Sequence, residues 1–188
     1  KWKKKSGDLI LNQLKKLGCS CDWSRNRFTM DEELSLAVTK TFVMLYKDKL
    51  IYKDTKLVNW DTKLETAISD LEVEQREVQS NLYYIKYKIL GDNNFITIAT
   101  TRPETLIGDT AVAVNPDDDK YKKLIGKKVL IPIVEREVEI ISDKYVSKEQ
   151  GSGALKVTPA HDFNDFEIGR RHKLTSINIF EKNGKINK

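Results

Sequence analysis

The sequence is poor in cysteine: among 188 residues it has only Cys19 and Cys21, and a single residue separates them. Cysteines this close rarely form an unstrained disulfide, and two thiols alone cannot complete a structural zinc site. The pattern therefore indicates the reduced thiols of a cytosolic protein rather than a disulfide framework or a zinc-stabilised domain.

Long apolar runs are also missing. No stretch approaches the roughly 20 apolar residues that a transmembrane helix needs, and no signal peptide is visible. Internal repeats and low-complexity tracts are absent as well. We therefore expect no membrane partner.

Composition supports a folded, modestly basic protein. Hydrophobic residues make up 39% of the chain, and the length suits one large domain or two small ones. The 33 Lys+Arg residues exceed the 28 Asp+Glu residues, which gives a net charge of +5. This surplus fits contact with a polyanion such as nucleic acid, although many solvated surfaces have the same balance.

The hydrophobic period changes along the chain. Before residue 75, Asp8 and either Thr29 or Asp31 are placed to cap helices with apolar residues at three-to-four spacing. From residue 82 onward apolar and polar residues alternate, which is typical of strands. The expected strands are 57–60, 82–90, 95–100, 111–114, 129–133, 137–141, 153–157 and 177–180, and the expected helices there are 117–124 and 162–172.

These patterns predict the α/β (α+β) class. A mostly helical segment covers residues 1–75, and a mixed, β-barrel-like domain covers residues 76–188.

Two short segments carry the polar side chains that point to chemistry. Residues 99–105 bring hydroxyls and one guanidinium to the end of an apolar run, and residues 158–165 bring two carboxylates and an imidazole to a helix start. Together they would form a polar pocket that binds an ammonium group and a hydroxyl and positions a water. Neither segment places an obvious covalent nucleophile beside a base, so the pocket suits hydrolysis of an aminoacyl ester by water.

Each of these residues also has a structural interpretation. Asp162 is placed to cap the helix and Asp165 to complement its dipole, and Arg102 fits an ordinary strand end. Gly151 and Gly153 fit either a turn or the close approach of a ligand to the backbone. Lys156, inside a strand, needs an acidic partner or an edge position.

The chain resembles the valyl-tRNA synthetase family over essentially its whole length. Residues 17–25 and 28–31 are similar to the segment after the ATP-binding half of the catalytic domain, and residues 50–74 to the connection into the inserted editing domain. Residues 100–115 and 151–169 are similar to the editing pocket.

The resemblance implies an internal fragment of such an enzyme. Residues 1–75 would belong to the catalytic body and its connector, and residues 76–188 to a C-terminally incomplete editing domain. Members attach valine to tRNA(Val) using ATP with Mg²⁺; this chain lacks both ATP-site signatures, so no cofactor is expected in it. The implied partners are tRNA(Val), its 3′-terminal aminoacyl-adenosine and the remainder of the synthetase, in a cytoplasmic monomer.

The resemblance also implies an editing hydrolase. Valine enzymes are themselves an example of the limit on selection by size: a hydrophobic pocket rejects threonine by only about a hundredfold, so a second site removes the mischarged product. The resemblance assigns substrate contacts as follows: Asp165 binds the α-ammonium; Lys156, Thr158 and Asp162 read the threonine side chain; Thr100, Thr101, Arg102 and Thr105 frame the adenosine and the water; and Gly151, Gly153 and His161 lie in the matching motifs.

The chain departs from the family at a few positions. Gln150 replaces a common aromatic residue and Ser152 a threonine, and Asp61 and Leu64 stand where some members have zinc-binding cysteines, so no metal is expected. Two alternatives stay open. The chain could bind tRNA without hydrolysing an ester, or it could belong to the related leucine enzymes, which share Thr-Thr-Arg-Pro and Ala-His-Asp but differ over residues 108–116.

Overall fold

The computed structural model describes residues 2–187 and divides into two compact units, one ending at Thr55 and the other beginning at Lys56. Residues 56–75 thus belong to the second compact unit. The functional boundary expected at residue 75 stays a prediction.

The first unit is helical, as expected. Asp31, not Thr29, caps its long helix, because the Asp31 carboxylate accepts a hydrogen bond of 2.8 Å from the Leu34 amide. The apolar stripe of that helix is largely exposed, with Phe42 at 54%. The helices are α1 (Trp2–Ser6), α2 (Leu9–Lys16) and α3 (Glu32–Lys47), and a 3-10 turn, η1, covers Trp23–Arg25.

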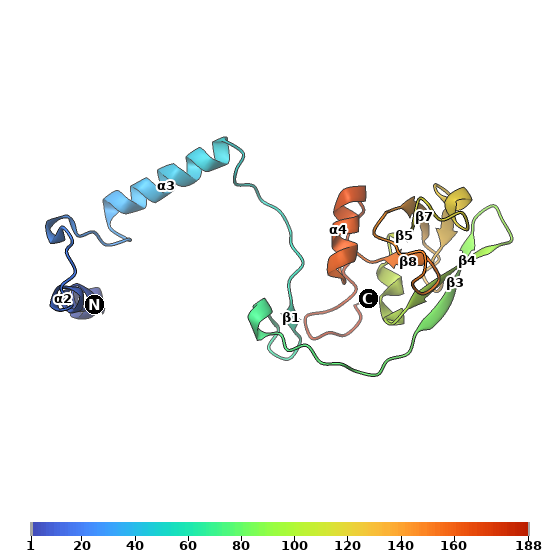
Figure 1. The fold of residues 1–188 in the computed structure, drawn as a ribbon, viewed down its shortest axis with the longest axis horizontal. Helices are drawn as coiled ribbons and strands as arrows, with labels where there is room; N and C mark the ends of the chain where they lie inside the picture. The colour runs from blue at the N-terminus through green and yellow to red at the C-terminus, as the bar shows by residue number, and fades with distance from the viewer. Residues whose placement is uncertain (1, 188) are drawn as a thin grey trace. The chain divides into compact units, whose positions relative to one another are not determined.

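The second unit is built on a six-stranded mixed sheet, shown from green to orange in Figure 1. Its strand order is β4-β3-β6-β7-β5-β8, and all neighbours are antiparallel except β5 and β7, which are parallel. The strands are β3 (Tyr83–Ile89), β4 (Phe95–Thr100), β5 (Ala111–Val114), β6 (Lys128–Leu130), β7 (Glu137–Ser142) and β8 (Ala154–Val157).

The two edge strands of this sheet, β4 and β8, also contact each other. The sheet therefore curves until it is nearly closed, which confirms the expected barrel-like architecture. Closure brings the end of β4 beside the end of β8, and these strand ends carry the two polar segments recognised in the sequence.

Strand β5 is buried on both faces. Val112 and Val114 point into one core cluster with Ile98 and Ile140, whereas Ala111 and Ala113 belong to a second cluster. The second cluster includes Ile168 of helix α4 (Phe163–His172), which packs on β8. The small alanines let the helix approach the sheet closely.

Several local predictions need correction. Residues 117–124 form only a 3-10 turn, η4 (Lys122–Leu124), and residues 177–180 form no strand but contribute one bridge, Phe180 to Ile186. Residues 177–180 find too few backbone groups on a neighbouring strand to pair with. The strand expected at residues 57–60 shrinks to β1 (Trp60–Asp61), paired with β2 (Thr66–Ala67), beside the 3-10 turn η2 (Asp70–Glu72).

No helix in the described range 2–187 is long and apolar enough to cross a membrane.

Candidate functional site

One cleft in the second unit, with a volume of about 850 Å³, collects nearly all of the predicted site residues. Gln150, the atypical position, lines it as well. Gly153 does not; its backbone turns at φ +79° against Asp118 and Tyr121. The predicted residues that line the cleft are Thr100, Thr101, Arg102, Thr105, Gly151, Lys156, Thr158, His161, Asp162 and Asp165.

A tight turn after β4 shapes one wall. The Arg102 amide donates to the Thr100 hydroxyl at 3.1 Å, and Pro103 then begins the 3-10 helix η3 (Pro103–Gly108). Proline suits this position because it has no N–H to offer to a continuing strand. The turn aims residues 100–105 at the cleft.

The opposite wall is the start of α4. Asp162 caps the helix, because its Oδ1 accepts hydrogen bonds from the amides of Asn164 at 2.8 Å and Asp165 at 3.1 Å. The structural interpretation of Asp162 is therefore confirmed, and the same residue lines the cleft.

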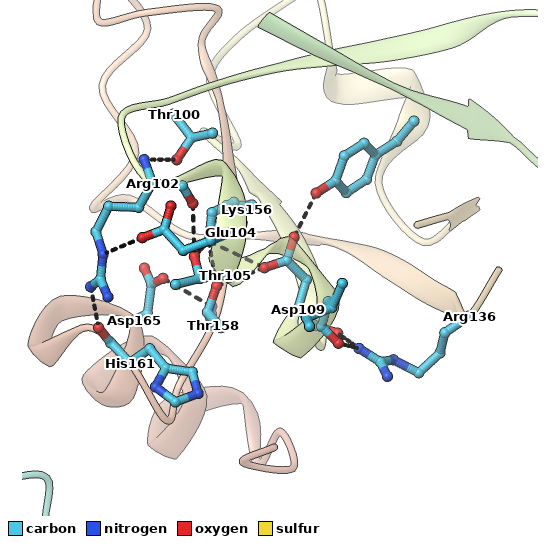
Figure 2. A network of polar contacts seen from close by, with 12 residues as sticks. Thr100, Arg102, Glu104, Thr105, Asp109, Arg136, Lys156, Thr158, His161 and Asp165 are labelled. Carbon is cyan, nitrogen blue, oxygen red and sulfur yellow. Dashed lines mark hydrogen bonds and ion pairs between the residues drawn. The ribbon is translucent and has the colours of Figure 1, made fainter. Parts of the chain in front are cut away.

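Asp109 is the centre of the polar network at the cleft floor. It is fully buried. Its Oδ1 accepts from the Thr158 hydroxyl at 2.6 Å and lies 3.3 Å from the Lys156 Nζ, and its Oδ2 accepts from the Tyr87 hydroxyl at 2.6 Å. Figure 2 shows Asp109, Lys156 and Thr158 converging in this network. Arg136 fixes the segment by donating to the Asp109 carbonyl at 2.8 Å.

Sequence reasoning missed Asp109, although a signal was present. Lys156 lies in a strand and is only 6% exposed, so it needs an acidic partner. Asp109 lies two residues before the apolar strand β5, whose residues pair with β8. The sheet register, which the sequence does not give, joins the two.

Lys156 uses all three of its ammonium N–H groups inside the protein. Besides Asp109, it donates to the Thr105 hydroxyl at 2.6 Å and to the Thr158 hydroxyl at 2.5 Å. Direct contact between Lys156 and a substrate therefore stays a prediction. In this structure the lysine acts on the two threonine hydroxyls.

This arrangement fixes what the hydroxyls offer to a ligand. Thr158 donates its hydrogen to Asp109 and accepts from Lys156, while Thr105 donates to the Arg102 carbonyl at 3.0 Å and accepts from Lys156. A hydroxyl has one hydrogen and two lone pairs. Each threonine is left with one lone pair, so the cleft floor presents acceptors.

Asp165 is a second acceptor beside Thr158. Its Oδ2 accepts from the Thr158 amide at 2.9 Å, which leaves Oδ1 for a ligand. The pKa of Asp165 is raised to about 6; burial is the main cause, the Thr158 hydrogen bond opposes the shift, and the nearby Asp162 charge adds to it. The carboxylate is thus mainly ionised at pH 7 and would gain strongly from a cationic ligand.

His161 is a wall of the cleft and not a base. Its Nε2 accepts a hydrogen bond of 3.0 Å from the Ile179 amide. Its ring lies edge-on to Phe180, with centroids 4.8 Å apart. Burial, together with the positive charge of Arg102, lowers the pKa of His161, so the ring is neutral at pH 7.

Arg102 connects the two walls. Its side chain donates to the His161 carbonyl at 2.7 Å and to the Glu104 carboxylate at 3.3 Å (Figure 2). The guanidinium has five N–H groups, so others stay free for a ligand. Across the described residues, no group of three His, Cys, Asp or Glu side chains is arranged to hold a metal ion.

Comparisons with known proteins identify the family of this chain. The family model for class I tRNA synthetases (I, L, M and V) matches residues 1–176. The valine–tRNA ligase of Pelagibacter ubique is 66% identical over 99% of this chain and 21% of its own length; that of Bradyrhizobium diazoefficiens is 63% identical over 97% of this chain and 20% of its own.

The chain spans about a fifth of the length of these relatives. Among solved structures, the ternary complex of LeuRS, tRNA and LeuAMS from Agrobacterium radiobacter matches with 18% identity and a TM-score of 0.46, covering 94% of this chain and 32% of that one. By the family match over residues 1–176, this chain belongs to the class I tRNA synthetases (I, L, M and V).

Proposed function

We propose that this chain carries an editing site that hydrolyses threonyl-tRNA(Val), within a synthetase that attaches valine to tRNA(Val) using ATP and Mg²⁺. The identity to valine–tRNA ligases supports the choice of amino acid. On this proposal the partners are tRNA and the remainder of the longer synthetase, in the cytoplasm.

The observation that carries the proposal is a pair of adjacent acceptors. The Asp165 carboxylate and the Thr158 hydroxyl belong to residues that are hydrogen-bonded to each other, and both line the cleft. Threonine carries its ammonium and its hydroxyl on neighbouring carbons. Two neighbouring acceptors match these two donors.

The ammonium group selects aminoacyl esters in general. Asp165 is 6% exposed, and an ammonium that replaces the little water at its carboxylate would form a strong charge-assisted hydrogen bond. An uncharged acyl group would leave Oδ1 of this buried carboxylate without a partner, because the Thr158 amide bonds only to Oδ2.

The hydroxyl selects threonine over valine. The threonine hydroxyl can donate its hydrogen to the remaining lone pair of Thr158 or to Asp162. Valine places a methyl group there, which leaves a buried acceptor unpaired, at a cost of about 1–3 kcal/mol for each acceptor. The editing site thus rejects valyl-tRNA(Val), the correct product, because valine cannot supply the missing hydrogen bond.

Hydrolysis proceeds by direct attack of water. Water adds to the ester carbonyl carbon, the bond to the ribose oxygen breaks, and the products are threonine, a proton and tRNA with a free terminal hydroxyl. The threonines and Arg102 at the end of β4 frame the adenosine and the water. His161 cannot activate a nucleophile because its Nε2 already accepts a hydrogen bond.

The test is deacylation of threonyl-tRNA(Val) and valyl-tRNA(Val) by the chain, side by side. We expect rapid loss of the threonyl ester only, and strongly reduced loss with Asp165→Asn. Asp119→Asn, an exposed carboxylate outside the cleft, is the matched control. If the chain binds tRNA in a gel-retardation assay but leaves both esters intact, the result would instead support a binding module. Cleavage of a different mischarged tRNA would support the leucine-type alternative.

A further inference from the structure

A second cleft of about 760 Å³ adjoins the first. Arg102, His161 and Asp162 line both clefts and form the ridge between them. The proposed hydrolysis involves no residue of the second cleft other than these three. Its remaining side chains differ in character from the hydroxyl-rich floor of the first.

Three aromatic side chains line this second cleft: Trp60, Phe163 and Phe180. Trp60 is 42% exposed, and its indole N–H donates to the Lys182 carbonyl at 2.8 Å, which fixes the plane of the ring. Phe163 is the first residue of α4 and is 51% exposed. Neither ring is needed to fill the core, so their faces are free for a ligand.

The same cleft has cationic side chains. Lys56, Lys182 and Arg102 line it, against the carboxylates of Glu181 and Asp162. One Asp162 oxygen is already committed to capping α4. Aromatic faces beside flexible cations are the combination that binds single-stranded nucleic acid, since bases stack on the rings and phosphates meet the cations.

We propose that the second cleft binds the unpaired nucleotides that precede the terminal adenosine of the tRNA. The inference rests on the proposed function, because an adenosine ester in the first cleft is joined through its 5′ phosphate to the preceding nucleotide. The nucleotide chain must therefore leave the first cleft close to the bound adenosine. Arg102 lies on the ridge and has N–H groups free to bind this phosphate, and the second cleft lies on the other side of the ridge.

The experiment compares two threonyl esters that differ only in these nucleotides. One is threonyl-adenosine, and the other is the threonyl ester of the trinucleotide cytidylyl-cytidylyl-adenosine, with which tRNAs end. We expect kcat/KM of the 188-residue chain to be at least about fivefold higher for the trinucleotide ester, because base–aromatic stacking contributes at least that much.

Phe163→Ala should remove most of this gain and change kcat/KM for threonyl-adenosine by less than about twofold. Phe95→Ala is the matched control, because Phe95 is 54% exposed on β4 and lines neither cleft. It should keep the full gain. The proposal would be overturned if kcat/KM of the unaltered chain were the same for both esters, or if Phe163→Ala kept the full preference for the trinucleotide ester.

Failure of the proposed hydrolysis is distinguishable from failure of this inference. If neither ester is cleaved, binding of the unacylated trinucleotide tests the second cleft independently. Binding is measured by the fluorescence of Trp60 in a Trp2→Phe, Trp23→Phe background. Quenching by the trinucleotide at a concentration at least about fivefold below that needed for adenosine supports the second cleft. Equal or absent quenching refutes it.

Discussion

Replacing Asp109 by asparagine should destabilise the second unit by about 3 kcal/mol. The Asp109 side chain is fully buried and that of Lys156 is 7% exposed, so the substitution leaves an ammonium without its charge partner in a site with little water. Breaking such a buried pair costs about 3–5 kcal/mol. The lower figure applies because the asparagine oxygen can still accept from Thr158.

A double variant separates the lost charge from lost packing. Asp109→Asn with Lys156→Met removes both members of the pair, and methionine keeps most of the lysine volume. We expect it to recover at least half of the lost stability, because replacing both charges by groups of similar shape is far milder than removing one.

The measurement is urea unfolding of the second unit, followed by the fluorescence of Trp60. Trp2 and Trp23 are replaced by phenylalanine in every variant, so that the signal comes from the second unit alone. A loss below about 1 kcal/mol in Asp109→Asn, or a double variant no more stable than the single one, would refute the pairing described here.

The remaining predictions concern pH and the cleft backbone. The folded-state pKa of Asp165, about 6, lies above the ordinary 3.8, so the free energy of unfolding should decrease as pH rises from 3.8 to 6. At pH 7, Asp165→Asn should be more stable than the unaltered chain by about 3 kcal/mol. Urea unfolding at pH 3.8 and at pH 7 measures both effects. For the same reason, kcat/KM for threonyl-tRNA(Val) should fall about tenfold per pH unit below pH 6, and a flat profile would exclude Asp165 as the ammonium ligand. Gly151→Ala should cost about 1–3 kcal/mol, because φ is +62° and the new Cβ would lie 2.8 Å from the Ala99 Cβ; an unchanged unfolding midpoint would contradict this geometry.

The sequence determined the elements whose signals are local. Alternation predicted the β3–β4 hairpin, and a four-residue apolar run predicted β5. Asp31 and Asp162 predicted the starts of their helices because an N-cap side chain bonds to amides two or three residues away. The two polar segments could also be recognised as parts of one pocket, and the structure places both on the same cleft.

Where a signal depended on partners elsewhere, the sequence was a poor guide. Residues 117–124 and 177–180 have plausible helix and strand patterns, but a regular element also needs a surface to pack on or a strand to pair with. Only the closed sheet decides which segments obtain one.

The tertiary structure alone decided what the site residues can do. Asp109 and Lys156 are 47 residues apart and meet because β5 pairs with β8, and this pairing turns Lys156 from a potential ligand into the group that orients two threonine hydroxyls. The Nε2 of His161 is likewise occupied by a backbone amide, that of Ile179, so this imidazole is not available as a base. The physical reason is the same in both cases: residue type sets which hydrogen bonds a side chain can make, whereas the folded chain sets which of them are already taken.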